Sequence, residues 1–200
     1  KHFKPKVFVA ENVKGLLSAN KGEAIDLILN EFESCGYYVK HKLLNASDFG
    51  VPQKRQRVFI VGFREKARAE KFNFPEPNTP QQDQKITLRS VVRNEDNENE
   101  KLYFSERAVA GLQKTKNLLT MNKGRAQNLD APCNTVASHL AKVSLNSTDP
   151  VMMHGNRYRM FSPREVARIQ SFPDDFELAE SKTWNYVALG NAVPPVMMWH

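Results

Sequence analysis

The feature that most constrains the fold is the order of short apolar runs and one amphipathic repeat in residues 6–64. The run at residues 7–10 is typical of a buried strand. Four apolar residues then recur at the spacing of one helix face: Ile25, Ile28, Leu29 and Phe32. Residues 37–44 and 57–63 are again rich in strand-forming residues. The order strand, helix, strand, loop, strand predicts part of an α/β sheet.

Local signals suggest how these elements begin, end and pair. Asn20, with Glu23 three residues later, has the pattern of a capping box, and Gly36 suits the helix end. The loop between the last two strands is too short for a crossover helix, so we expect them to be antiparallel neighbours. A parallel sheet of two strands would be unusually small. We therefore expect further strands to come from outside these residues.

The rest of the chain divides by composition. Residues 65–100 are polar, proline-rich and then acidic, which predicts a linker or surface loop. Residues 101–160 carry nine lysine and arginine residues against three acidic ones. Such a band attracts polyanions, although a solvated lysine face is equally consistent with it. Order returns at Ser162-Pro163-Arg164-Glu165, a helix start with cap, proline and capping-box glutamate, and residues 184–189 suggest a helical turn.

Length and cysteine content narrow the class of protein further. The chain has 200 residues and no apolar run near the roughly 18 that a membrane span needs. It begins at Lys1 rather than at a methionine, so we expect a fragment or a processed piece. Cys35 and Cys133 give no disulfide framework and no CxxC pair. A cytoplasmic setting with free thiols and no metal site is therefore expected.

Two short segments carry candidate chemistry. Glu11 follows the first predicted strand, at the sheet edge where α/β proteins bind ligands. Arg55 and Arg57 alternate in the segment Gln-Lys-Arg-Gln-Arg, so we expect them to share one strand face. Taken alone, each would be an ordinary surface charge.

Four motifs in this order resemble the DNA cytosine-C5 methyltransferase family. They are Glu-Asn-Val at residues 11–13, Gln-x-Arg-x-Arg at 53–57, Arg-Glu-x-Ala-Arg-x-Gln-x-Phe-Pro-Asp at 164–174, and Gly-Asn-Ala-Val-Pro-Pro at 190–195. The resemblance covers residues 1–64 and 157–200, and the segment between falls where this family keeps its variable target-recognition region. Any one motif would be a weak signal, but four in the family order are a strong one.

The resemblance implies an α/β fold: the C-terminal part of a Rossmann-like methyltransferase sheet plus a small target-recognition domain. Its parts would be a catalytic piece at 1–64, a linker and recognition region at 65–157, and a return segment at 158–200. It implies S-adenosylmethionine as methyl donor, double-stranded DNA as partner, a place in a restriction-modification system, and a target cytosine flipped out of the duplex.

The resemblance also assigns roles to single residues. Glu11 would contact N3 and the exocyclic amine of cytosine, where it must hold or share a proton. Arg57 would hold the carbonyl oxygen of the base and orient Glu11. Arg55 would contact the nucleotide backbone, where its planar fork suits phosphate. The cofactor would be placed by three consecutive residues: Asn191, Ala192 and Val193.

Two family features are missing from these 200 residues. The nucleophilic cysteine belongs to a Pro-Cys-Gln motif upstream of Glu-Asn-Val, and no two of the nine glycines form the Gly-x-Gly of the cofactor loop. Cys133 follows a proline but lies downstream, in Pro-Cys-Asn-Thr, so we expect a structural thiol. The chain would then need an N-terminal methyltransferase piece, from the same gene or a second subunit, and would be inactive alone.

Two other readings stay open at this level. One is a non-catalytic DNA-binding subunit or remnant, and the other is an RNA cytosine-C5 methyltransferase. His139 and His154 flank the recognition segment and are expected to be surface or structural residues, although either could reach a phosphate or base edge. The DNA sequence that such an enzyme reads depends on a few side chains placed in the grooves.

Overall fold

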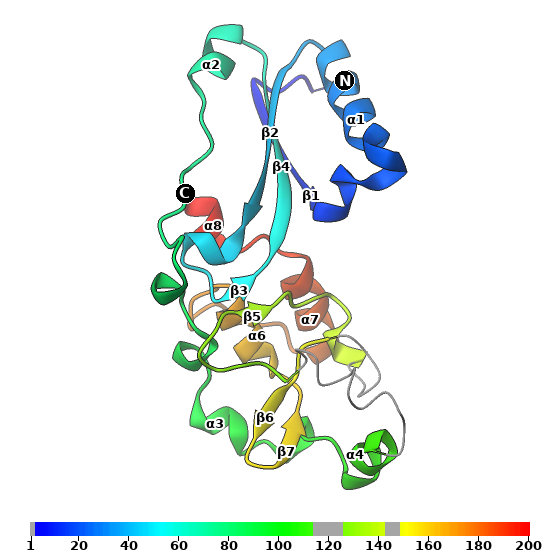
Figure 1. The fold of residues 1–200 in the computed structure, drawn as a ribbon, viewed down its shortest axis with the longest axis vertical. Helices are drawn as coiled ribbons and strands as arrows, with labels where there is room; N and C mark the ends of the chain where they lie inside the picture. The colour runs from blue at the N-terminus through cyan, green and yellow to red at the C-terminus, as the bar shows by residue number, and fades with distance from the viewer. Residues whose placement is uncertain (1–2, 114–125, 143–148) are drawn as a thin grey trace. The chain divides into compact units, whose positions relative to one another are not determined.

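The chain folds into two compact units in a computed structural model that describes residues 3–113, 126–142 and 149–200. The first unit comprises residues 1–45 and 56–76, and the second comprises residues 46–55 and 77–200. Figure 1 shows the elements of both. The expected division into a catalytic piece, a recognition region and a return segment, with borders at residues 64 and 157, stays a prediction. Residues 65–76 pack with the first unit, and the segment joining its last two strands belongs to the second.

The first unit is a small α/β sheet. Its elements are strands β1 (Val7–Val13), β2 (Tyr38–Asn45) and β4 (Gln56–Phe63), helices α1 (Glu23–Ser34) and α2 (Lys66–Lys71), and the short 3-10 helices η1 (Lys14–Leu17) and η2 (Ala19–Gly22). The strand order is β1-β4-β2. Strand β4 is antiparallel to both neighbours, so the predicted antiparallel pairing of the last two strands is confirmed.

The relation between β1 and β2 differs from the simplest expectation. The two strands run in the same direction, as a strand-helix-strand unit requires. They are not neighbours, however, because β4 lies between them and pairs with both. The chain reaches this position by leaving the unit after Asn45 and re-entering it at Gln56.

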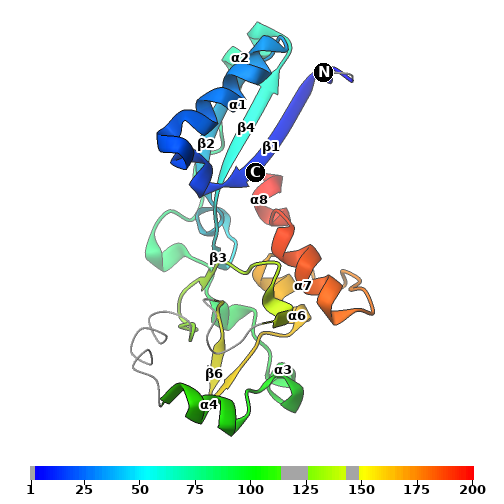
Figure 2. The ribbon, with the colours of Figure 1, turned by 90° about the vertical axis from the view of Figure 1, so that its right-hand side faces the viewer.

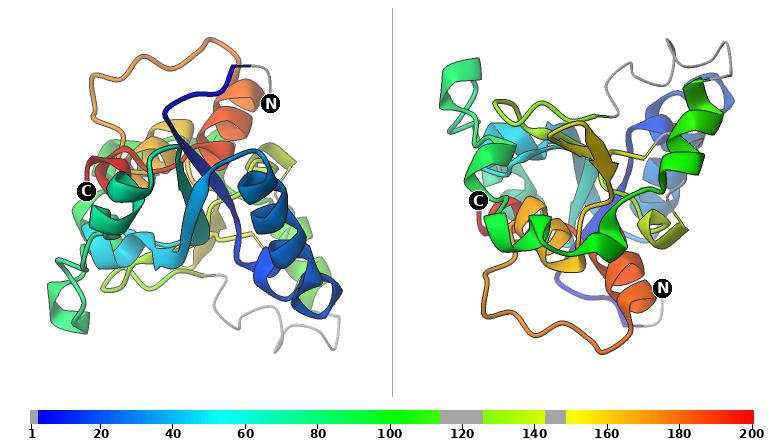
Figure 3. Two further views of the ribbon diagram at one scale, coloured as in Figure 1. Left: turned by 90° about the horizontal axis from the view of Figure 1, so that it is seen from above. Right: turned by 90° about the horizontal axis from the view of Figure 1, so that it is seen from below.

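The two faces of this sheet are covered by different helices. Val58 and Ile60 point to the α1 side, where they pack with Ile25 and the other three predicted apolar residues of that helix. Val61 and Phe63 point to the opposite side and pack with Ala69 of α2, Phe72 and Phe74. Seen from above, α1 and α2 accordingly lie on opposite sides of the strands (Figure 3).

The predicted start of α1 is wrong, whereas its predicted end is confirmed. The helix begins at Glu23 behind Gly22, and no side chain caps it. Asn20 and Lys21 both adopt left-handed backbone angles, with φ of 49° and 57°, which is incompatible with the extended backbone of a capping box. At the other end Gly36 has φ of 83°, the left-handed position that favours glycine after a helix.

The second unit consists of short elements around an apolar core. Its strands are β3 (Gln53–Lys54), β5 (Cys133–Asn134), β6 (Met152–His154) and β7 (Arg157–Arg159). Its α-helices are α3 (Asn94–Asn97), α4 (Glu106–Gln113), α6 (Pro163–Ile169), α7 (Lys182–Asn191) and α8 (Pro195–Trp199). Its 3-10 helices are η3 (Ala46–Phe49), η4 (Gln82–Gln84), η5 (Leu88–Ser90), η6 (Glu100–Leu102) and η7 (Leu140–Lys142).

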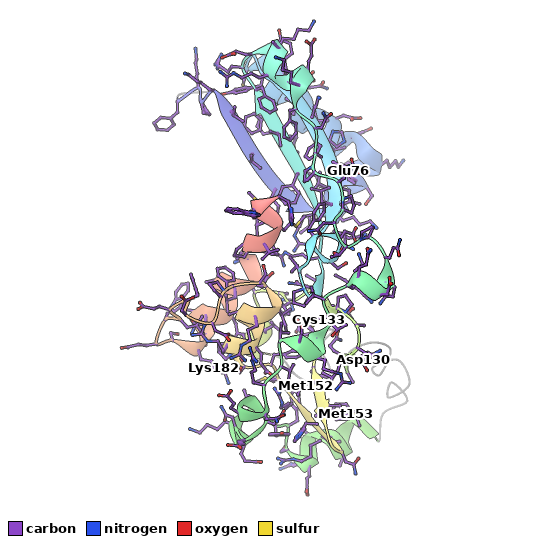
Figure 4. The ribbon with its side chains drawn as sticks, turned by 90° about the vertical axis from the view of Figure 1, so that its left-hand side faces the viewer. Glu76, Asp130, Cys133, Met152, Met153 and Lys182 are labelled. Carbon is purple, nitrogen blue, oxygen red and sulfur yellow. The ribbon has the colours of Figure 1, made fainter. Side chains whose placement is uncertain are left out.

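The core of the second unit joins segments that are distant in sequence. It contains Leu88, Cys133, Met152, residues of α6 and residues of α7. Helices α6 and α7 pack together (Figure 2), and Cys133 and Met152 are labelled in Figure 4. Leu88 is fully buried, so segment 65–100 is not simply the linker that its polarity suggested. None of the described helices is long and apolar enough to cross a membrane.

The start of α6 is the local prediction that the structure bears out most fully. Ser162 caps the helix and Pro163 is its first residue, while the Glu165 side chain accepts from the Ser162 backbone. Helix α7 is longer than predicted, because it begins at Lys182 and continues through Gly190 to Asn191.

Candidate active site

Glu11 and Arg57 meet on one face of the first unit's sheet. Glu11 lies opposite Phe59 across the β1–β4 ladder, and Arg57 lies opposite Val13. The two residues are therefore diagonal neighbours, a spacing that long side chains can bridge. Arg57 Nε lies 2.8 Å from Glu11 Oε1, and the side chains are 14% and 24% exposed. The structure thus brings these two predicted site residues into contact, and their joint action on a base stays a prediction.

The contact between them is an ion pair rather than an aligned hydrogen bond. Glu11 Oε1 is buried and has no hydrogen-bond partner of suitable geometry, despite the short distance to Arg57. Arg57 Nη1 instead donates to the backbone carbonyl of Gln56 at 2.9 Å. The carboxyl group is thus held by opposite charge while its hydrogen-bonding capacity is still available. Such a group suits a ligand that presents both a donor and an acceptor.

The surface of β1 around Glu11 is open and apolar. Every second residue of a strand lies on the same face, so Glu11 shares its face with Val7, Val9 and Val13. These three valines are 41%, 54% and 53% exposed. Strand β1 is also an edge strand, since it pairs only with β4 in the part of the chain that the structure describes. An exposed edge beside an apolar face is a surface that proteins normally cover.

Arg55 occupies a different environment from Arg57. Strand β3 ends at Lys54 and β4 begins at Gln56, so Arg55 belongs to neither strand, and the expected shared face does not describe the structure. The Arg55 side chain is in the second unit and only 2% exposed. Its Nη1 donates to the carbonyl of Val136 at 3.2 Å, and its Nη2 donates to that of Gly190 at 3.0 Å. A guanidinium used in this way is not presented to a phosphate, contrary to the role expected for Arg55.

Two glutamines extend this buried polar network. Gln53 is fully buried, donates to Gln170 Oε1 at 2.8 Å and accepts from the amide of Val136 at 3.0 Å. Gln170, also fully buried, donates to the carbonyl of Leu189. Both polar backbone groups of Val136 are therefore satisfied by side chains of the Gln-x-Arg segment, as buried polar groups require.

Gly190 allows the close approach on which this network depends. A Cβ at position 190 would lie 2.3 Å from the carbonyl carbon of Ala137 and from the amide nitrogen of Ser138. These are backbone atoms, so they cannot rotate away. The motif glycine is thus explained by packing of segment 137–138 against α7. Sequence reasoning singled out the motifs containing Gln170 and Gly190, but it did not foresee that they meet Gln53 and Arg55.

The predicted cofactor residues lie directly beyond this glycine. Asn191 is exposed and is the last residue of α7. Ala192 ends the helix, and its amide donates to the carbonyls of Ala188 and Leu189 at 3.0 and 3.3 Å. Asn191, Ala192 and Val193 therefore follow a firmly anchored helix end, and their contact with a cofactor stays a prediction.

The remaining titratable candidates have structural partners. Cys133 is fully buried, and its thiol pKa is raised strongly by burial and further by the charge of Glu165, which fits a structural thiol and not a thiolate nucleophile. His139 Nε2 lies 2.8 Å from Asp149 Oδ1. His154 Nδ1 lies 2.9 Å from the Tyr103 hydroxyl.

One buried pair escaped the sequence reasoning altogether. Arg159 and Glu165 are both fully buried and joined by two hydrogen bonds of 2.6 and 2.7 Å. Glu165 was predicted only as a capping-box residue. Nothing in the local pattern distinguishes Arg159 from Arg157, which is about half exposed and pairs with Glu100.

Comparison with known proteins agrees with the order of motifs and the fold. The family model of C-5 cytosine-specific DNA methylases matches residues 1–199. The chain is 38% identical to the type II methyltransferase M.NgoFVII of Neisseria gonorrhoeae, over 96% of this chain and 56% of the relative. It is 35% identical to M.FnuDI of Fusobacterium nucleatum, over 97% of this chain and 62% of that protein.

The fold is shared with solved structures that are more distant in sequence. A DNMT2 structure from Spodoptera frugiperda has a TM-score of 0.69 and 18% identity, over 96% of this chain and 64% of that one. The chain thus spans about three fifths of the length of these relatives. Because the family model covers nearly every residue and the four motifs fall within it, this chain belongs to the C-5 cytosine-specific DNA methylases.

Proposed function

We propose that this chain is the base-holding and target-recognition part of an enzyme that methylates C5 of cytosine in double-stranded DNA, within a restriction-modification system. The observation that carries the proposal is the Glu11–Arg57 pair, in which a carboxyl group with unused hydrogen-bonding capacity is held 2.8 Å from a guanidinium. Type II methyltransferases among its relatives support the same class of reaction.

The chemistry of cytosine explains why such a pair is wanted. C6 of the ring accepts a nucleophile only when N3 is protonated or hydrogen-bonded. Glu11 would hold that proton at N3 and accept from the exocyclic amine, and Arg57 would donate to the carbonyl oxygen of the base. The base can present these atoms only after leaving the duplex. Both side chains are partly exposed, which is consistent with access for a flipped base.

The methyl donor would be S-adenosylmethionine, which supplies the methyl group when bound. Asn191 offers an exposed carboxamide, able both to donate and to accept, and its backbone is fixed by the end of α7. Asn191, Ala192 and Val193 therefore suit one side of a cofactor site. These 200 residues contain no Gly-x-Gly, so we propose that the rest of the site comes from elsewhere.

The nucleophile would come from the same complementing piece. Neither Cys35 nor Cys133 belongs to a Pro-Cys-Gln motif, and Cys133 is buried with a raised pKa. We propose that a segment carrying the glycine loop and the Pro-Cys-Gln cysteine, in the same polypeptide or a second one, adds to the open edge of β1. The exposed Val7, Val9 and Val13 would then be covered.

The decisive experiment combines this chain with a relative's N-terminal piece that bears Pro-Cys-Gln. Transfer of labelled methyl groups from S-adenosylmethionine is measured on duplex DNA and on transfer RNA. We expect methylation of DNA, a loss of at least about a hundredfold for Glu11→Gln, and near-normal transfer for Cys133→Ser. Methylation of transfer RNA alone would establish an RNA methyltransferase. DNA binding without any transfer would indicate a non-catalytic subunit.

A further inference from the structure

The segment Gln53-Lys54-Arg55 presents its three side chains in alternating directions. Gln53 and Arg55 are 0% and 2% exposed and point into the second unit, whereas Lys54 is exposed. Alternation is the ordinary consequence of extended backbone. Its effect here is that the residue between the two motif positions is the one presented to solvent.

The backbone around Lys54 is fixed by hydrogen bonds to segment 133–136. Strand β3 pairs in parallel with β5, which places Lys54 beside Asn134. Around it, the amide of Cys133 donates to the carbonyl of Pro52 at 2.9 Å, and the Thr135 hydroxyl donates to the carbonyl of Lys54 at 2.7 Å. Together with the bonds of Gln53 and Arg55 to Val136, these contacts fix segment 133–136 to segment 52–55.

We propose that the Lys54 ammonium, and not the Arg55 guanidinium, makes the DNA-phosphate contact of this motif, and that Arg55 is a positioning residue. The inference rests on the proposed function in one respect, namely that DNA is the ligand. The motif then has two inward-facing residues that build a rigid support and one outward-facing cation that the support presents.

Charge distribution in the second unit favours Lys54 for this role. Its exposed arginines are largely neutralised, since Arg89, Arg93 and Arg157 pair with Asp130, Asp174 and Glu100. Within the described parts of the chain, no carboxylate oxygen lies within 4 Å of Lys54 Nζ. An exposed ammonium without a paired carboxylate can release counterions when it meets a phosphate.

The buried position of Arg55 argues against the same role. Its guanidinium would have to break two hydrogen bonds to backbone carbonyls and leave both acceptors buried. Leaving buried carbonyls unsatisfied is costly. Arg55 would also cease to bridge Val136 and Gly190. Its planar fork is suited to two carbonyls at once, a geometry that lysine cannot reproduce.

The test separates the two roles by the salt dependence of DNA binding. Binding of the 200-residue chain to a fluorescein-labelled duplex of about 20 base pairs is followed by anisotropy across a series of KCl concentrations. We expect Lys54→Gln to lower the salt slope by about one and to weaken binding roughly fivefold to tenfold near 0.1 M salt. The matched control Lys66→Gln, at an exposed lysine on α2, should leave the slope unchanged.

Arg55→Lys should behave in the opposite way. Its salt slope should equal that of the wild type, while the amides of Cys133 and Val136 exchange with deuterium at least about tenfold faster. Amides of β4 report whether the variant is folded. If Arg55→Lys does not fold, Lys54→Gln still decides, because its side chain lies at the surface.

Three outcomes would overturn the inference. An unchanged slope in Lys54→Gln would show that Lys54 meets no phosphate. A slope reduced in Arg55→Lys, with exchange unaltered, would return the phosphate contact to Arg55. Absence of salt-dependent DNA binding in the wild type would remove the proposed function and this inference with it, so the two failures are distinguishable.

Discussion

Two of the Glu–Arg pairs among the described residues, Glu11–Arg57 and Glu165–Arg159, have the same chemistry and opposite environments. Arg159 and Glu165 are fully buried, doubly hydrogen-bonded to each other, and further bonded to Asn97 and to the Ser162 amide. Glu11 and Arg57 are partly exposed, and their short contact is not an aligned hydrogen bond. In the buried pair, Arg159–Glu165, the charged groups are hydrogen-bonded within the protein, so the pair supports the fold. In the open pair, Glu11–Arg57, the carboxylate can still accept hydrogen bonds, so the pair can bind a ligand.

Removing one member of the buried pair should have the largest effect. Glu165→Gln leaves the Arg159 charge buried without a counter-charge, so we expect the second unit to lose about 3–5 kcal/mol of stability. Urea unfolding, followed by hydrogen exchange in α6 and in β1, measures the two units separately. The double variant Arg159→Met, Glu165→Met should recover much of the loss. If Glu165→Gln lowered the unfolding free energy by less than about 1 kcal/mol, the pair would not be important for the stability of the second unit.

Altering the open pair should affect activity and leave stability almost unchanged. Arg57→Lys keeps the charge but loses the planar fork that would hold both Glu11 and a base carbonyl. We expect methyl transfer by the complemented enzyme to fall about a hundredfold, roughly 2.7 kcal/mol in transition-state stabilisation. The unfolding free energy should change by less than about 1 kcal/mol, as for partly exposed pairs. Equal losses in stability and activity would contradict the distinction.

The sequence pointed to Glu11 and Arg57 as a pair, but it did not point to the buried pair of Arg159 and Glu165. Glu11 and Arg57 lie in motifs, and strand positions give a direct guide to the face on which each lies. Glu165 also lies in a motif but Arg159 does not, and the six positions between them run from the end of β7 into α6, so no single repeat relates their side chains. The Gln53–Gln170 bond joins residues 117 positions apart. No periodicity encodes such a contact, although the resemblance did indicate that both residues matter.

Capping shows the same limit at a shorter range. The Ser162 box formed as predicted, because Ser162 takes the extended backbone that a capping residue needs. The Asn20 box has equally good residues, but Asn20, Lys21 and Gly22 are all left-handed in the turn that leads from η1 into α1. The sheet order β1-β4-β2 was also beyond the sequence, because local patterns identify strands without identifying all their neighbours.

The two cysteines also differ in how far their thiols are buried. Cys133 is fully buried and its pKa is raised by burial, whereas Cys35 is half-buried. We expect a thiol reagent at pH 8 to label Cys35 in the native chain and to reach Cys133 only after unfolding. Cys133→Ala should cost about 1–2 kcal/mol, since it leaves a small cavity beside α6 and α7. Rapid native labelling of Cys133 would reverse the assignment of this thiol as structural.

The exposed ion pairs of the second unit are expected to contribute least to stability. Hydrogen bonds from Arg157, Arg89 and Arg168 lower the pKa values of Glu100, Asp130 and Asp174, respectively. A carboxyl group with a depressed folded pKa adds stability above its unfolded pKa and loses it as pH falls through the folded value. We therefore expect a small loss of stability that begins near about pH 5, where unfolded carboxyl groups start to protonate, and grows as the pH falls further.

Salt distinguishes this surface contribution from the buried pair. Exposed ion pairs are screened, so the small acid-sensitive contribution should shrink further in about 1 M KCl. Arg159 and Glu165 have no contact with solvent, and the destabilisation caused by Glu165→Gln should persist at high salt. Unfolding curves of wild type and Glu165→Gln at pH 7 and pH 3, each at low and high salt, measure both terms. If high salt abolished the effect of Glu165→Gln, the buried pair would have to be regarded as one more surface contact.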